Sequence, residues 1–243
     1  MQNAVCAYAT IPLRTEPDHR AEMCSQLLFG ESVIITDCAL DGWVKVINTY
    51  DQYAGWCKYL QLINTETCLD KTLFFTGEWA GELNVNGKKL MVPFGTPVPD
   101  GLDVNYEGNR IFVCDFSEEK LLSYSEKYIN TPYLWGGRSV FGIDCSGFVQ
   151  AVYRFFGIAL KRDAYLQVNQ GEEVAFLPAC KTGDVAFFDD EEGKITHVGI
   201  LLDAQNILHA SGNVRIDKID HGGIIHTESG KRTHNLRVIR RMV

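Results

Sequence analysis

The sequence predicts an α+β protein: short β-strands fill the N-terminal half, and helices precede an antiparallel sheet in the C-terminal half. Two observations predict this class. β-branched runs separated by turns occupy the first half of the chain, and apolar residues at helical spacing begin only after Ser117. With 243 residues, the chain has room for one large domain or two to three small ones, each around a buried core.

The first 63 residues contain the strand-like segments "SVIITD", "DGWVKVINT" and "YAGWCKYLQLI", and the dipeptide Asp41-Gly42 is a strong hairpin signal. The order of short motifs here, F-G-E-x-V, then W-x-K-V, then G-W-C-x-x-x-L, resembles the bacterial SH3-like domain, a small β-barrel. We therefore expect an SH3-like β-barrel over residues 1–63.

Residues 64–116 contain a weaker version of the same pattern. Here "KKLMVPFGTPVP" is similar to "SQLLFGESVII", and "NRIFVCD" could supply the matching late strand. One interpretation is a second, degenerate SH3-like β-domain over 64–116. The other is one elaborated β-domain with a long connector.

Residues 117–243 form the expected third domain. "SEEKLLSYSEKYIN" combines a serine cap with apolar residues at helical spacing, and residues 146–156 carry a broad apolar face. Strand-like segments follow: "DVAFFDD", "KITHVGILLD", "NILHASGNVRID" and "HNLRVIRR". This order predicts helices packed on an antiparallel sheet.

Charge and hydropathy exclude several classes of partner. The net charge of −8 argues against nucleic acid and against an anionic membrane surface, because both usually select a basic face. No segment approaches the roughly 20 apolar residues that span a bilayer. The N-terminus lacks a basic start and an apolar stretch, so we expect a cytoplasmic protein, or a secreted or periplasmic one if a leader has been removed. The sequence leaves the oligomeric state open, and we expect a monomer.

The 8 cysteines are scattered and include no C-x-x-C, so neither a disulfide framework nor a zinc site is expected. Cys145 differs from the others because it lies between the loop "GID" and a predicted helix. Unpaired N–H groups and the positive end of the helix dipole favour an anion at a helix start. We therefore expect a lowered pKa for this thiol.

A nucleophilic thiolate also needs a base with an orienting partner. His197 lies in "KITHVGILL" and His209 in "NILHASG", on successive predicted strands. Either histidine alone could be a structural imidazole, but the two could orient one another. Because side chains alternate along a strand, His197 and His209 share a face only if the hairpin pairs odd-numbered residues with odd-numbered residues. A regular hairpin then needs an odd number of unpaired turn residues, such as 204–206.

"PYLWGGRSVFGIDCSGFVQAVYR" resembles the nucleophile motif of the NlpC-type papain-like cysteine peptidases. "KRDAYLQ", "GDVAFFD", "THVGILL" and "ILHASG" follow in the order of that family. The resemblance implies a papain-like catalytic domain with Cys145 as nucleophile, His197 as base and His209 as the third, polar member.

The resemblance also implies a set of substrate-binding residues. Tyr133 would help to bind the oxyanion, Trp135 would form an apolar wall, and polar groups of the substrate would meet Asp144, Ser146 and Asp163. The family has a serine after the aspartate of "KRDAYLQ", whereas this chain has Ala164. The expected substrate cleft therefore lacks one hydroxyl, and the consequence for recognition of the substrate remains open.

Family members with N-terminal SH3-like domains are γ-D-glutamyl-L-diamino acid endopeptidases of the dipeptidyl-peptidase VI type, in which the barrel closes one end of the cleft. "HRAEMCSQLLFGE" and "DQYAGW" are similar to the barrel segments involved. By that resemblance, Glu22 would pair with the substrate ammonium and Tyr53 would line its pocket. The alternative is an exposed loop acid and a surface tyrosine.

The resemblance thus implies a cysteine peptidase that hydrolyses the γ-D-glutamyl-L-diamino acid bond of murein peptides with a free N-terminal L-Ala, in peptidoglycan recycling or degradation, and that needs no cofactor. A secreted hydrolase of intact peptidoglycan and a non-catalytic wall-binding module remain open as alternatives. The third residue of the peptide, lysine or diaminopimelate, also remains open.

Overall fold

The computed structural model describes residues 2–243, which divide into two compact units. The first unit contains the chain through Cys114 together with the short segment Trp135–Phe141. The second unit contains Asp115–Leu134 and Gly142–Val243. The glycine-rich segment before Cys145 is thus divided between the two units.

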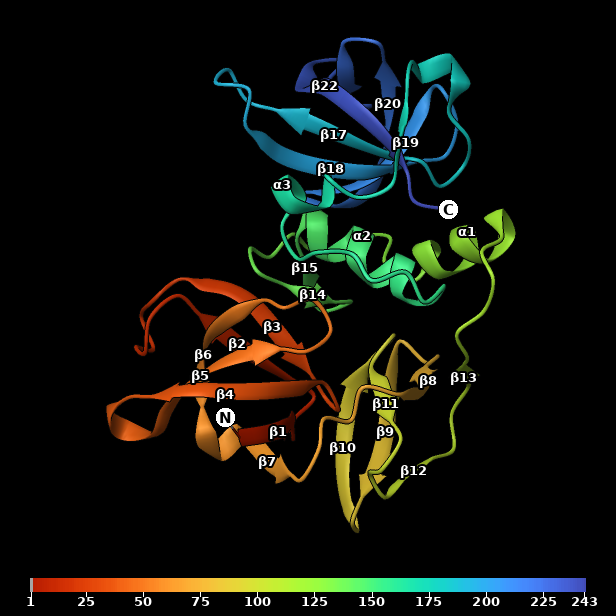
Figure 1. The fold of residues 1–243 in the computed structure, drawn as a ribbon. Coiled ribbons are helices and arrows are strands. Elements are labelled where there is room, and N and C mark those ends of the chain that lie inside the picture. Colours follow the sequence, from red (N-terminus) through yellow and green to blue (C-terminus); the bar gives the residue numbers. More distant parts are fainter. Residues whose placement is uncertain (1) are drawn as a thin grey trace. The chain divides into compact units, whose positions relative to one another are not determined.

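The first unit opens with a seven-stranded sheet in the order β3-β2-β6-β5-β4-β1-β7 (Figure 1). Its turn between β4 and β5 has Asp41 at φ 57° and Gly42 at φ 71°, the left-handed pair that an Asp-Gly turn provides. Alternate residues of these strands bury one apolar cluster, which includes Leu13, Val33 and Val46. The strands are β1 (Gln2–Cys6), β2 (Thr10–Arg14), β3 (Met23–Leu28), β4 (Ser32–Cys38), β5 (Trp43–Asn48), β6 (Ala54–Lys58) and β7 (Leu62–Thr65).

The rest of the first unit contains two three-stranded sheets, β10-β9-β12 and β11-β8-β13. Asn86 and Gly87, both at positive φ, form the turn of the β9–β10 hairpin. Phe74, Leu83 and Val92 lie in a second apolar cluster between these sheets, which Phe29 also joins. That this segment is a second SH3-like domain stays a prediction. The strands are β8 (Thr72–Thr76), β9 (Ala80–Val85), β10 (Lys88–Pro93), β11 (Pro97–Pro99), β12 (Val104–Tyr106) and β13 (Arg110–Ile111).

A buried ion pair ties the segment Trp135–Phe141 to the first unit. Within that segment β14 (Arg138–Ser139) begins with Arg138, whose guanidinium contacts both carboxylate oxygens of Glu31 at 2.8 and 3.0 Å. The carbonyl of Gln26 accepts a further hydrogen bond from Arg138 Nη1 at 2.7 Å. Residue exposures of 4% for Arg138 and 3% for Glu31 mean that neither charge can be compensated by water.

The second unit combines three helices with a seven-stranded antiparallel sheet in the order β16-β22-β17-β18-β19-β20-β21. The helices are α1 (Glu118–Glu126), α2 (Cys145–Arg154) and α3 (Ala164–Gln167). The strands of this sheet are β16 (Glu172–Val174), β17 (Val185–Asp189), β18 (Ile195–Leu201), β19 (Asn206–Ser211), β20 (Asn213–Asp220), β21 (Gly223–Ile225) and β22 (Arg232–Arg241). The short strand β15 (Gly142–Ile143) lies outside this sheet.

This sheet closes on itself, because β21 pairs with both β20 and β22. One face of the closed sheet buries its own apolar cluster, which includes Phe188, Leu201, Ile207 and Ile224. Helix α2 packs against β18 and β19, as Figure 1 shows. The expected layer of helices on a sheet is therefore correct only in part, since a barrel that fills its own interior dominates the domain.

Both predicted helix starts are found, each with a side-chain cap. Ser117 Oγ accepts a hydrogen bond from the backbone of Lys120 at the start of α1. Asp144 caps α2 by accepting from the N–H of Gly147 at 2.7 Å. Cys145 is consequently the first residue of α2.

Candidate active site

Cys145 is held at the first turn of α2 by a network of buried polar groups. Asp144 accepts hydrogen bonds from Arg162, with Nη1 and Oδ1 3.0 Å apart, and Arg162 also donates to Ser146 Oγ at 3.0 Å. Gln167 Nε2 donates to the carbonyl of Ser146 at 3.0 Å. Arg162 and Gln167 both come from "KRDAYLQ", and the sequence analysis assigned neither a role.

The resting state of Cys145 is a thiol. Burial raises its pKa to about 12, and the neighbouring carboxylate of Asp144 acts in the same direction. Backbone hydrogen bonds from Val198 and Ser146, and the charge of Arg162, lower the pKa but do not outweigh burial. The prediction of a lowered thiol pKa is therefore wrong for this structure, because a helix start acts weakly on a group removed from water.

The contact with Val198 places the thiol against β18, beside the residue that follows His197. The hairpin of β18 and β19 pairs Gly199 with His209 and Leu201 with Ile207, so odd residues face odd residues as predicted. His197 Nε2 lies 2.9 Å from His209 Nδ1. Two side chains 12 residues apart thus form one hydrogen-bonded pair.

The chain of hydrogen bonds continues beyond His209. Its Nε2 lies 3.1 Å from Oδ2 of Asp217, a residue of β20 that the sequence analysis did not single out. Asp217 also accepts from Nε of Arg215 at 2.9 Å and from the N–H of Thr227 at 2.8 Å. No short sequence motif marks this aspartate, and only its pairing across β19 and β20 brings it to His209.

His234 of β22 stacks on His197, with ring centroids 4.0 Å apart and ring planes inclined by 25°. Phe188 is the third ring of this group, with its centroid 5.7 Å from that of His197. The sequence analysis assigned His234 no role, because it lies near the end of the chain in a polar stretch. It reaches His197 because β22 and β18 flank the same strand, β17, in the sheet.

Burial keeps these imidazoles neutral. Burial lowers the pKa of His197 well below its ordinary value of 6.5, and the nearby His234, His209 and Arg215 lower it further. Burial also lowers the pKa of His209, against the opposing effect of Asp217, and lowers that of His234 to about 4. Cys145 and His197 therefore rest as a neutral thiol and a neutral base.

Tyr133, the predicted oxyanion residue, belongs to the second unit and interacts electrostatically with Cys145 and Asp144. Burial raises the pKa of its hydroxyl, and the neighbouring Cys145 and Asp144 raise it further. The hydroxyl consequently stays protonated and can donate a hydrogen bond. Its backbone N–H donates to the carbonyl of Gly212 at 2.8 Å, which fixes the chain at that point.

The other predicted substrate-binding residues differ in exposure and bonding. Asp144 and Ser146 are buried in the Arg162 network described above, whereas Asp163 is the N-terminal flanking residue of α3. In the first unit, Trp135 donates its indole N–H to Oε1 of Glu22 at 2.6 Å, and both side chains are exposed. Tyr53 lies two residues after Asp51, whose Oδ1 accepts a hydrogen bond from the backbone N–H of Tyr53. Substrate binding by these residues stays a prediction.

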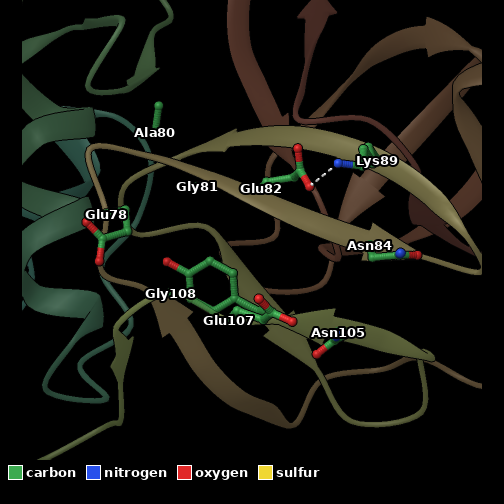
Figure 2. Close-up of a pocket in the computed structure, with 10 residues that line it drawn as sticks. Glu78, Ala80, Gly81, Glu82, Asn84, Lys89, Asn105, Glu107 and Gly108 are labelled. Atoms are coloured by element: carbon green, nitrogen blue, oxygen red, sulfur yellow. Dashed lines mark ion pairs between the residues drawn. The ribbon is translucent and has the colours of Figure 1, made fainter.

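A separate pocket of about 440 Å³ lies in the first unit, over β9, β10 and β12. Figure 2 shows Glu82 and Lys89 on its wall as an ion pair of 2.9 Å, with Glu78, Asn84 and Asn105 around it. Within residues 2–243, no group of three or more histidine, cysteine, aspartate or glutamate side chains is placed to hold a metal ion. No helix in the same range is long and apolar enough to cross a membrane.

A cysteine at a helix start, a histidine pair on adjacent strands and a closed antiparallel sheet define a papain-like fold. Residues 130–232 match the model of the NlpC/P60 family, and residues 13–58 match that of the bacterial dipeptidyl-peptidase SH3 domain. The chain belongs to the NlpC/P60 family of hydrolases and carries an SH3-like domain ahead of the family domain.

Comparison with known proteins covers nearly the whole chain. The γ-D-glutamyl-L-lysine dipeptidyl-peptidase of Bacillus subtilis is 31% identical over 79% of this chain and 76% of its own length. A crystal structure of an NlpC/P60 family protein from Bacillus cereus has a TM-score of 0.81 at 21% identity, and the match covers 99% of both chains. The probable endopeptidase p60 of Listeria innocua is 35% identical, but over only 42% of this chain and 22% of its own.

Proposed function

We propose that the chain is a cysteine endopeptidase that cuts the γ-D-glutamyl-L-diamino acid bond of murein peptides with a free N-terminal L-Ala. The observation that carries the proposal is how much of this chain each relative matches. The match with the Bacillus subtilis dipeptidyl-peptidase covers 79% of this chain, which is more than the family domain at residues 130–232, whereas the match with the Listeria endopeptidase covers 42%. The supporting likeness therefore includes the N-terminal part.

The hydrogen-bond chain supports an acyl-transfer mechanism. Because Nε2 of His197 is engaged by His209, its Nδ1 is the nitrogen that remains for the thiol. In the proposed reaction His197 takes the proton of Cys145, and the sulfur attacks the γ-carbonyl carbon of D-Glu. His197 then protonates the departing amine, and water attacks the thioester to release L-Ala-D-Glu and the free thiol. No metal or organic cofactor takes part.

The raised pKa of Cys145 gives the base an essential role. A protonated thiol is a poor nucleophile, so removal of its proton must accompany attack. The proposed oxyanion donors are the N–H of Cys145 at the start of α2 and the hydroxyl of Tyr133. Both are donors in their resting states.

The first unit contains the carboxylate that we propose to bind the N-terminus of the peptide. Glu22 is an exposed carboxylate, and its Oε1 is held by the indole N–H of Trp135. Trp135 is two residues beyond Tyr133 in the chain. We propose that this carboxylate receives the ammonium of the substrate L-Ala and that the enzyme works in the cytoplasm on recycled peptides.

The test is digestion of L-Ala-γ-D-Glu tripeptides that end in L-Lys or in diaminopimelate, with mass spectrometry of the products. We expect L-Ala-D-Glu and the free diamino acid from at least one of the two peptides. Cys145→Ala should remove turnover, His197→Ala should be nearly as severe, and His209→Ala should be milder. Cys38→Ala, at an exposed cysteine, is the matched control. Efficient digestion of intact, cross-linked peptidoglycan would instead support a secreted wall hydrolase.

Cell fractionation tests the proposed location. An antibody to the chain should detect it in the cytoplasmic fraction of the native cell, together with a cytoplasmic marker protein. Recovery of the protein from the medium or the wall fraction would contradict a role in recycling inside the cell.

A further inference from the structure

A histidine pair has two possible hydrogen-bond directions, and only one of them leaves a base for the thiol. Neutral imidazole has one N–H donor and one acceptor nitrogen. If His209 donated through Nδ1 to Nε2 of His197, then Nδ1 of His197 would carry the proton and could not accept another. If His197 donates through Nε2, its Nδ1 keeps a lone pair. Something beyond the pair must select the direction.

Asp217 is placed to make that selection. Its side chain is 1% exposed, and both its oxygens are engaged by N–H groups from outside the histidine pair. Burial raises the pKa of Asp217, but the hydrogen bonds from His209 and Thr227 and the charge of Arg215 outweigh burial and hold the pKa below its ordinary value. The carboxylate is thus ionised and can only accept hydrogen bonds.

An acceptor at 3.1 Å from Nε2 of His209 requires the proton to be on that nitrogen. His209, kept neutral by burial, then has only a lone pair on Nδ1, so His197 must donate through Nε2. Nδ1 of His197 is left as the acceptor. The direction of both hydrogen bonds therefore follows from one buried carboxylate, which is two hydrogen bonds away from His197.

We propose that Asp217 is a positioning residue, anchored by Arg215 and Thr227, that sets the tautomers of His209 and His197 and so completes a four-membered relay with Cys145. Asp217 contacts neither the thiol nor the substrate in this role. The inference rests on the proposed function for its catalytic consequence, whereas the tautomers themselves are a property of the free protein.

The first experiment is ¹⁵N NMR of the full chain labelled at histidine, without substrate, at neutral pH. We expect the signals of His197 and His209 to show protonated Nε2 and unprotonated Nδ1. A protonated Nδ1 on His197 in the unchanged protein overturns the proposal, whatever any variant does. Failure to cleave either tripeptide would instead count against the proposed function and would leave this result intact.

The second experiment compares Asp217→Asn with Asp220→Asn. Asp220 is on the same strand and forms an ion pair with Arg232 at 2.7 Å, and within residues 2–243 its hydrogen-bond partners are Arg232, Gly222 and Gly223 rather than a histidine. Asp217→Asn should convert His197 to a mixture of tautomers and lower kcat by roughly 10- to 100-fold with little change in KM, since a misdirected base slows chemistry more than binding. Asp220→Asn should change neither.

Asp217→Glu is the conservative rescue, because it keeps the charge and should restore part of the kcat and most of the correct tautomer. Circular dichroism melting identifies a variant that fails to fold, and in that case the measurement on the unchanged protein decides. An Asp217→Asn protein that is folded and keeps both its tautomers and its kcat contradicts the proposal.

Discussion

The imidazole of His234 lies nearly parallel to that of His197, with 4.0 Å between ring centroids. The two residues are 37 positions apart and belong to strands that are not neighbours in the sheet order. The stack covers one face of the base and removes it from water. It also keeps a second ionisable ring beside the base. The pKa of that ring is lowered to about 4, so His234 is neutral at higher pH.

Replacement of His234 by alanine should shift the acid limb of the pH dependence of kcat/KM upward. The change exposes the face of His197 to water and removes a neighbour that lowers its pKa, so the pKa of His197 should rise toward 6.5. His221→Ala, at an exposed turn histidine, is the control and should leave the limb unchanged. An unaltered limb in His234→Ala would mean that the stack does not tune the base.

The Cys145 thiol should react slowly with iodoacetamide at neutral pH, and its rate should still be rising above pH 9. The reason is the pKa of about 12, which leaves little thiolate in the free enzyme at pH 7. Peptide mass spectrometry after timed alkylation gives the rate at Cys145 separately from the other cysteines. A plateau near neutral pH would reveal a preformed thiolate and contradict the neutral resting pair.

Stability should fall as the pH is lowered from about 6.5 toward 4. His197, His209 and His234 all have pKa values below 6.5 in the folded protein, so the unfolded chain takes up protons first and is favoured as the pH falls. Each histidine adds a slope of up to about 1.4 kcal/mol per pH unit. Urea unfolding at several pH values measures this, and a free energy of unfolding that is constant from pH 7 to pH 5 would refute it.

Glu31→Gln should destabilise the folded protein by about 3–5 kcal/mol, because it removes the carboxylate charge that both guanidinium nitrogens of the buried Arg138 contact. Asp100→Asn removes the exposed ion pair with Lys71 and is the control, with an expected cost of about 1 kcal/mol or less. Denaturant midpoints give both values. Equal effects in the two variants would show that burial of the Glu31–Arg138 pair has no special energetic consequence.

Acetylation of the substrate L-Ala amine should lower kcat/KM by roughly 10- to 150-fold, because it removes the charge that Glu22 is proposed to bind. Glu22→Gln should weaken cleavage of the free-amine peptide and narrow its advantage over the acetylated one. Glu16→Gln, at another exposed acid before β3, should preserve that advantage. If Glu22→Gln leaves the ratio of the two substrates unchanged, Glu22 does not select the ammonium.

The sequence by itself determined features that depend on near neighbours in the chain. Ser117 and Asp144 cap helices because a side-chain oxygen three residues before a backbone N–H can accept from it. Asp41-Gly42 turns a hairpin because both residues tolerate positive φ. The shared face of His197 and His209 follows from strand alternation once the short hairpin turn sets the register.

Only the tertiary structure decided what lies around the candidate site. Asp217 reaches His209 through strand pairing, His234 reaches His197 across the intervening strand β17, and Arg138 meets Glu31 across 107 positions. The thiol pKa was mispredicted for the same reason. Helix position is a local property, whereas removal of water depends on every segment that covers the group, and that sum of distant contacts is not contained in any short stretch of sequence.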